Sequence, residues 1–456
     1  MSVDLFPRAG ETGRVAADPT RRTPALSPPA PGPLWPHAAN AMLGLWLATG
    51  PASFAPHHPG LVWNAIISGV LIVGLSALAC SPRFPWVIWV TAAVGLWLMV
   101  APLVFWAPTA AAFATDTLIG TLVVAFAVLI PGTPAARDVP GPSVPPGWSY
   151  NPSAWPQRAG IVVLALVQFL VARHLAAYQL RHIPEPWDPV FGEGTRRVLD
   201  SDVSKAFPVS DAGLGAFTYL LEALAGLVGG TRRWRTMPWA VLLFGVLVVP
   251  VGVVSIVLVV LQPLAVGAWC FLCLVTAAVT VFMISPAADE VVATGEFLLR
   301  ARREGRSVWQ TFWYGGDAET PPAGEPVKHE SLVRQLAGGM ELVTVPWNLV
   351  SCAAVGVWLM VAPAVLGSTG AAAAGDQLVG ALVVTFAVIG FGEPARIARW
   401  VSIPLGAWLL LGAWLLPGAP PAARWNDVVA GVAVALLSLR RGPVLERFGG
   451  WSRYVV

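Results

Sequence analysis

The chain alternates between long apolar runs and short polar segments. Twelve runs approach the roughly 20 residues that a helix needs to cross about 30 Å of hydrocarbon. Because a backbone in lipid must satisfy its own hydrogen bonds, these runs predict helices rather than open sheets. The sequence therefore predicts an all-α, polytopic membrane bundle. Its expected spans are 38–54, 61–80, 85–105, 114–131, 158–180, 213–230, 237–261, 264–285, 346–366, 376–392, 400–416 and 426–439.

Composition agrees with this pattern. Of the 456 residues, 56% are hydrophobic and 12% are charged, whereas soluble domains carry roughly 25% charged residues. The 22 Trp residues suit membrane–water boundaries. The net charge of +3 is spread between the apolar runs, so no nucleic-acid surface is expected. The composition thus favours contact with membrane lipid over a soluble core.

The distribution of basic residues predicts the orientation. If the N-terminus is cytoplasmic, the arginine clusters at 232–235 and 300–306 fall on the inner side, as the positive-inside rule requires. The long outer loop 182–212 then carries six acidic residues against three basic ones. Both termini are expected in the cytoplasm, with 1–37 a disordered tail. The preference for Arg over Lys, with abundant Ala, Gly and Pro, suggests a GC-rich bacterial genome. The expected location is therefore the bacterial inner membrane.

An internal repeat marks both ends of the chain. The pattern G-x-W-L-x-x-x-P begins at Gly44, Gly95 and Gly356, and its first half recurs at Gly406. A second glycine follows 24 or 25 residues later, and an Asn or Asp precedes it. Each unit predicts a helical hairpin in which small residues permit close packing. The units resemble the SPW-repeat family over about 38–131 and 346–439, which implies packing or scaffold elements and no established chemistry.

The centre of the chain holds a close cysteine pair, Cys270 and Cys273. Spacing of three places both sulfurs on one helix face, close enough to bond. We expect the pair about two turns inside the span 264–285, whose start Pro263 marks. Two cysteines in an apolar helix can also be inert, so redox chemistry and packing both stay open from the spacing alone. Cys80 and Cys352 are expected to be simple buried thiols.

The centre also resembles the vitamin K epoxide reductase family in its bacterial, quinone-linked form. The resemblance rests on WDPVFGEGTRRVLDS at 187–201, on FPVSDAGLG at 207–215, and on the CxxC pair in the fourth helix of a four-helix unit. It implies that an outside thiol exchanges with Cys270, nearer the surface, and that Cys273 passes electrons to a quinone between the four helices. Ubiquinone and menaquinone both remain open. The implied partner is an extracytoplasmic thiol protein or a small thiol.

The resemblance also suggests neighbours for these reactants. Ser210 or Asp211 at the start of the second helix, and Trp269 or Phe271 beside the cysteines, are candidate quinone contacts, with packing or helix capping as the alternative. Weaker candidates are Ser201 in the matching loop, Glu222 as a proton-handling group inside a span, and His174 with His182 as aids to thiol deprotonation. No metal-ligand spacing occurs.

Two departures from the family pattern limit the mechanism. Loop 182–212 contains no cysteine, and Thr195 occupies the place of the second shuttle cysteine. Thr276 and Ala277 replace the aromatic hydroxyl that follows the CxxC pair. An internal cysteine relay is therefore excluded, so a thiol must reach Cys270 directly or the redox role has been lost. A non-enzymatic scaffold is the main alternative, and a transporter ranks last because few polar residues lie at mid-bilayer.

The predicted organisation has five parts. They are a tail at 1–37, a repeat pair at 38–135, a central four-helix domain at 158–286, a cytoplasmic linker at 287–345 and a second repeat pair at 346–442. Within the linker, residues 296–304 predict a helix that lies on the inner leaflet.

Overall fold

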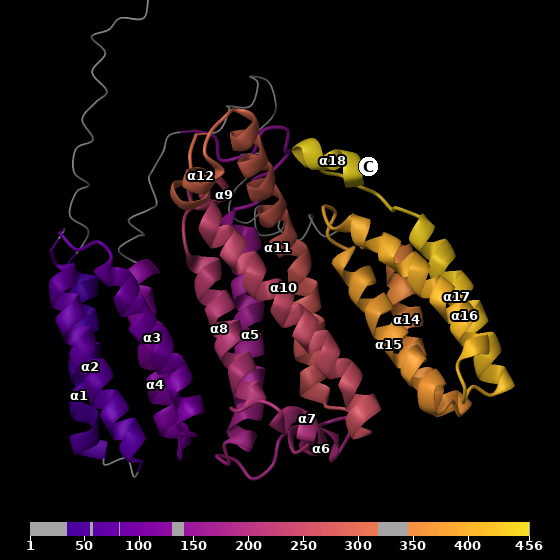
Figure 1. Ribbon diagram of the computed structural model, residues 1–456, viewed down its shortest axis with the longest axis horizontal. Helices are drawn as coiled ribbons and strands as arrows, with labels where there is room; N and C mark the ends of the chain where they lie inside the picture. The colour runs from indigo at the N-terminus through magenta and orange to yellow at the C-terminus, as the bar shows by residue number, and fades with distance from the viewer. Residues whose placement is uncertain (1–33, 55–57, 82, 130–140, 318–344, 456) are drawn as a thin grey trace, which may run out of the picture. The chain divides into compact units, whose positions relative to one another are not determined.

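The computed structural model describes residues 34–54, 58–81, 83–129, 141–317 and 345–455 (Figure 1). Almost all regular structure in these ranges is helical, and Trp148 and Phe448 form an isolated β-bridge. The all-α fold is thus confirmed. Residues 1–33 of the predicted tail and 318–344 of the predicted linker lie outside the described residues.

The two repeat pairs each consist of two helical hairpins. The first has α1 (Trp35–Phe54), α2 (Pro59–Ala79), α3 (Val87–Val104) and α4 (Ala110–Val124), which a π-helical turn η1 (Ala125–Leu129) extends. The second has α14 (Trp347–Leu366), α15 (Gly370–Ile389), the 3₁₀ turn η3 (Arg396–Val401), α16 (Ser402–Leu415) and α17 (Pro421–Leu439). The chain ends with η4 (Gly449–Trp451) and α18 (Ser452–Val455).

The repeat glycines lie where the two helices of a hairpin meet. A Cβ at Gly69 would lie 2.5 Å from the carbonyl oxygen of Gly44, and one at Gly380 would lie 2.6 Å from that of Gly356. The repeat tryptophan and asparagine join neighbouring hairpins, because Trp97 Nε1 donates to Asn64 Oδ1 and Trp358 Nε1 to Asn426 Oδ1, each at 2.7 Å. The motif therefore encodes contacts within and between hairpins.

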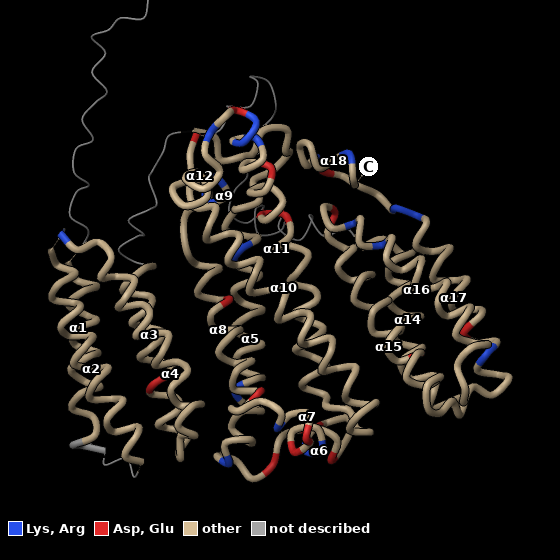
Figure 2. Tube along the Cα trace, in the orientation of Figure 1, with Lys and Arg blue, Asp and Glu red and all other residues tan. Residues whose placement is uncertain are grey.

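The central domain contains four long helices: α5 (Trp155–Gln179), α8 (Asp211–Leu227), α10 (Pro238–Leu261) and α11 (Phe271–Arg303). At one end lie the short helices α6 (Gly194–Leu199) and α7 (Asp202–Lys205), and at the other lie α9 (Arg233–Thr236) and α12 (Val308–Tyr314) (Figure 1). Charged residues gather near both sets of short helices, and few lie along the long ones (Figure 2). This distribution is typical of a bundle surrounded by lipid.

Ten helical segments within the described residues are long and apolar enough to cross a membrane. They comprise α2, α3, α4 with η1, α5, α10 with its π-helical extension, α11, α14, α15, η3 with α16, and α17. The chain is therefore a polytopic membrane protein. Helices α1 and α8 are not among the ten, and α8 has only 17 residues. The count of twelve spans stays a prediction.

Helix α11 is longer than the sequence suggested. It runs for 33 residues through Pro286, so the described residues 296–303 are its last turns and not a separate helix. Beside this proline, Gln157 of α5 donates to the carbonyl oxygen of Pro286 at 3.0 Å and to Asp289 Oδ2 at 2.9 Å. These contacts join α11 to α5 at the point where hydropathy alone indicated an end of the helix.

Candidate functional site

The cysteine pair lies at the first turn of α11, not two turns inside a helix. Pro263 does not start that helix; it belongs to the π-helical turn η2 (Gln262–Val266), which continues α10. Gly267 then adopts φ +66°, a left-handed conformation that glycine accepts readily, and the chain leaves the helix. Cys270 is the N-cap of α11. The predicted start at Pro263 was wrong because hydropathy does not reveal this break.

Cys270 and Cys273 form a disulfide with their Cα atoms 5.3 Å apart. The backbone N–H of Cys273 donates to Cys270 Sγ at 3.1 Å, and the N–H of Cys270 donates to Gln262 Oε1 at 2.9 Å. Cys270 is fully buried, whereas Cys273 is half-buried. The resemblance implied the reverse, a more accessible Cys270.

The loop before α6 covers the start of α11. Trp187 packs edge-on against Phe271, with ring centroids 6.1 Å apart. Gly194 approaches so closely that a Cβ there would lie 2.2 Å from the carbonyl oxygen of Trp269. His174 contributes, since its Nε2 accepts from the N–H of Trp187 at 3.1 Å. The segment that carries the family resemblance is therefore packed onto the cysteine pair.

Asp188 holds this loop in shape. Its carboxylate accepts from the N–H groups of Val190, Phe191 and Thr195, and from the Thr195 hydroxyl at 2.7 Å. Partial burial acts to raise the pKa of Asp188, but the hydrogen bonds to Phe191, Thr195 and Val190 outweigh it and leave the pKa below its ordinary value. Thr195, at the place of the shuttle cysteine, is wholly buried.

A cavity of about 310 Å³ lies between the four long helices, and Cys273 lines it. Cys270 is not part of its wall. The lining is mainly apolar and comes from every helix of the unit, from α6 and from α7. Representative members are Ala172, Leu175, Leu199, Val203, Leu214, Tyr219, Val251, Val254, Leu258 and Thr276. Small-molecule sites are typically apolar cavities of about this size or larger with a few polar groups.

Most hydroxyl groups in the cavity wall already donate to the protein. The acceptors are the carbonyl oxygens of Val198 for Ser201, of Gly215 for Thr218 and of Cys273 for Thr276, and Asp211 Oδ1 for Ser204. Within the described chain, the wall donors without an acceptor are Tyr219 Oη, Ser255 Oγ and Gln262 Nε2. An apolar cavity with unused donors fits a quinone, which has an apolar ring and carbonyl acceptors.

The candidate quinone contacts from the sequence, and the weaker candidate Ser201, do not all line the cavity. Asp211 and Ser201 line the cavity, but Ser210, Trp269 and Phe271 do not. Ser210 is the N-cap of α8, where its Oγ accepts from the N–H of Gly213 at 2.9 Å.

Two further polar candidates, Glu222 and His182, do not line the cavity that Cys273 borders. Glu222 is fully buried in α8, and neither of its carboxylate oxygens has a hydrogen-bond partner in the described chain. His182 bonds to the carbonyl oxygen of Ala107 at 2.7 Å.

Gln262 was not among the site residues predicted from the sequence. It contacts the backbone of Cys270, lines the cavity and is only 3% exposed. A signal was present, because Gln262 and Ser255 are the only side chains with hydrogen-bonding groups in the apolar stretch 240–266. Polar residues inside spans are often functional.

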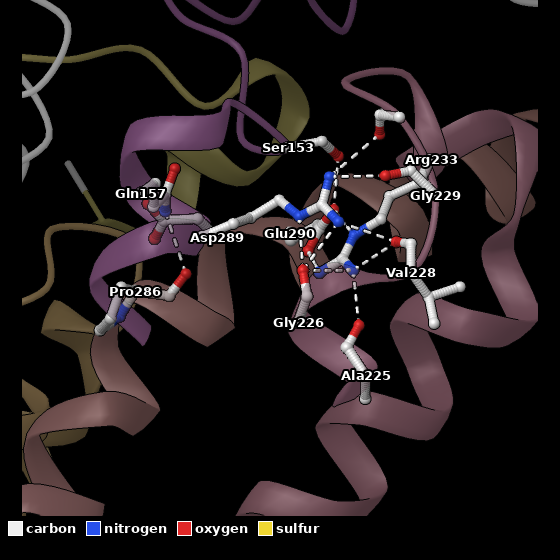
Figure 3. Close-up of polar contacts among 12 residues, drawn as sticks. Ser153, Gln157, Ala225, Gly226, Val228, Gly229, Arg233, Pro286, Asp289 and Glu290 are labelled. Carbon is white, nitrogen blue, oxygen red and sulfur yellow. Dashed lines mark hydrogen bonds and ion pairs between the residues drawn. The ribbon is translucent and has the colours of Figure 1, made fainter. Parts of the chain in front are cut away.

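The opposite end of the four-helix unit holds an arginine cluster. Figure 3 shows its members Ser153, Arg233 and Glu290, and Arg158 joins them through the carbonyl oxygen of Gly226, to which Arg233 also donates. Arg233 bonds both carboxylate oxygens of Glu290, at 2.6 and 2.5 Å, and Ser153 donates to the same carboxylate at 2.5 Å. Arg158 donates to the carbonyl oxygens of Gly226, Val228, Gly229 and Gly230, which end α8. In this cluster Arg233 is paired with Glu290 and Arg158 is hydrogen-bonded to backbone carbonyl oxygens, so both buried guanidinium groups have partners.

Comparison with known proteins identifies the parts of the chain. The sequence profile of the vitamin K epoxide reductase family matches residues 159–287. The profile of the SPW repeat domain matches residues 34–130 and 337–441. A vitamin K epoxide reductase family domain therefore lies between two SPW repeat domains. No curated protein and no solved structure matches the chain.

Proposed function

We propose that the central domain is a membrane thiol–disulfide oxidoreductase that oxidises extracytoplasmic thiols and passes their electrons to a membrane quinone. The observation that carries this proposal is the place of Cys273. Its sulfur is bonded to Cys270, and the residue lines an apolar cavity between four helices. The family match supports thiol–disulfide chemistry in general.

The thiol half of the reaction consists of two exchanges. A substrate thiolate attacks Cys270 Sγ, the Cys270–Cys273 bond breaks, and Cys273 leaves as a thiolate. A second substrate thiolate attacks the substrate sulfur of the mixed disulfide and releases Cys270. The substrate is oxidised to a disulfide, and the cysteine pair is reduced by two electrons.

Re-formation of the Cys270–Cys273 disulfide delivers two electrons and two protons to a bound quinone, which leaves as the hydroquinone. The net reaction converts two thiols and one quinone to one disulfide and one hydroquinone. Ubiquinone and menaquinone both satisfy this balance.

The N-terminus of α11 suits this chemistry. The positive end of a helix stabilises an anionic sulfur, and the N–H of Cys273 already points at Cys270 Sγ. Because Cys270 is fully buried, the covering loop must move before a thiol can attack. Loop 182–212 has no cysteine to relay electrons, so the substrate must reach Cys270 itself.

The proposed orientation places the disulfide end of the domain on the extracytoplasmic side of a bacterial inner membrane, with both termini in the cytoplasm. Arginine placement along the sequence supports it. A thiol then arrives from the side that permits disulfides, and the quinone arrives from the lipid.

Trapping separates this function from a scaffold. The full chain in lipid nanodiscs is treated with a reduced thiol peptide, and alkylation mass spectrometry reads the cysteines before and after a quinone is added. Cys273→Ser has no disulfide for a thiol to open, so it is given the disulfide form of the peptide instead. Its Cys270 thiolate should attack the peptide disulfide, release one peptide thiol and keep the other half as a mixed disulfide, whereas Cys270→Ser should not. Cys352→Ser, in α14, is the matched control. A disulfide that neither opens with thiol nor re-forms with quinone would leave the non-enzymatic scaffold.

A further inference from the structure

In the side-chain amide of Gln262, the oxygen accepts a hydrogen bond and the nitrogen donates none within the described chain. Only an oxygen can accept the N–H of Cys270, so this bond of 2.9 Å fixes Oε1 on the backbone of the cysteine. Nε2, which carries two hydrogens, then makes no hydrogen bond within the described chain. Since Gln262 lines the cavity with Cys273, an amide donor is available next to the redox pair.

The other wall donors cannot take this position. Thr276 and Ser201 donate to backbone oxygens, and Ser204 donates to Asp211. Ser255 precedes Gln262 by seven residues, about 10 Å along α10.

Tyr219 packs with Ala172, Ala216 and Val251. Val251 lies about 16 Å before Gln262 along the helix. Gln262 is therefore the unused donor at the disulfide end of the cavity.

We infer that Gln262 is the residue that binds a quinone carbonyl oxygen beside Cys273. The inference rests on the function proposed above and names its specificity residue. A quinone oxygen gains negative charge as electrons arrive, and a donor already oriented toward it stabilises that charge. The hydrogen bond from the Cys270 N–H to Oε1 fixes the orientation of the amide. One side chain therefore contacts both the cysteine backbone and the quinone.

The test compares two ligands that differ in their carbonyl groups. The oxidised full chain in nanodiscs is titrated with 2-methyl-1,4-naphthoquinone and with 2-methylnaphthalene, and quenching of tryptophan fluorescence gives each Kd. Gln262→Glu, titrated above the pKa of the introduced carboxyl group, keeps an acceptor for Cys270 and has no donor, whereas Gln262→Met removes both. Gln310→Met, at an exposed glutamine of α12 that does not line the cavity, is the control.

Both Gln262 variants should bind the naphthoquinone about 10- to 100-fold more weakly, as expected for a hydrogen bond to a partly charged acceptor, and should bind the naphthalene unchanged. Equal loss of both ligands would mean that Gln262 only shapes the cavity, and no loss of either would mean that it makes no contact; each result overturns the inference. A wild-type chain that binds neither ligand would instead refute the quinone site itself.

Discussion

The arginine cluster and the cavity of the central domain differ in whether their hydrogen-bond donors have partners. In the arginine cluster, the guanidinium of Arg158 bonds to four backbone carbonyl oxygens and that of Arg233 bonds to Glu290. In the cavity wall, Gln262 near the disulfide, and Tyr219 and Ser255 farther from it, have donors that the described chain does not use. Satisfied groups stabilise a closed end, whereas unsatisfied groups beside a cavity indicate a place for a ligand.

The largest expected effect is on activity. Cys273→Ser should abolish quinone-dependent thiol oxidation, because no other cysteine in the sequence lies near Cys270. The measurement is hydroquinone formation by the full chain in nanodiscs with a thiol substrate. Cys352→Ser should keep the wild-type rate, and a Cys273→Ser protein that still turned over would end the proposed mechanism.

The next effect tests whether the arginine cluster is structural. Glu290→Ala leaves the Arg233 guanidinium buried without its partner, and removing one member of a buried ion pair costs about 3–5 kcal/mol. Denaturant-induced unfolding in detergent measures the loss in free energy of unfolding. Glu193→Ala breaks an exposed pair with Arg196 and should change nothing measurable. Equal stability of the two variants would contradict the comparison.

A smaller effect concerns the cover over the disulfide. Gly194→Ala puts a Cβ against the carbonyl oxygen of Trp269, and overpacking of this kind costs about 1–3 kcal/mol. The loop should therefore open more often, and a phosphine should reduce the disulfide about tenfold faster or more. Gly230→Ala, at the arginine cluster, meets nothing within 4 Å and is the control. Unchanged reduction rates would mean that this loop does not restrict access.

The smallest effect is the pH dependence of access to the disulfide, because Asp188 stabilises the loop that covers it. The pKa of Asp188 is lowered in the folded loop, so its stabilisation is complete above the ordinary value of about 3.9 and is lost as pH falls through the folded pKa. Phosphine reduction, compared with a free peptide disulfide at each pH, should accelerate only in that acidic range. Asp188→Asn should remove the transition, and a transition that persisted in this variant would assign it to another group.

The sequence by itself determined the membrane class, the repeat hairpins, the central family domain and the cysteine pair. Each depends on local information: the length of apolar runs, the period of a motif, or residues that are close along the chain. The glycines at 44 and 69 could be paired in the same way, because a hairpin brings its two helices together at a fixed spacing.

Only the tertiary structure decided how the site is built. Residues 237–285 read as two apolar spans, and nothing in hydropathy shows that Gly267 turns the chain and makes Cys270 an N-cap. The bond from Cys270 to Gln262, the cover by Gly194 and the pairing of Arg233 with Glu290 join groups from different segments. Which buried polar groups find partners depends on the packing of helices that are remote in sequence, and that packing separates the closed end of the domain from the end with the cavity.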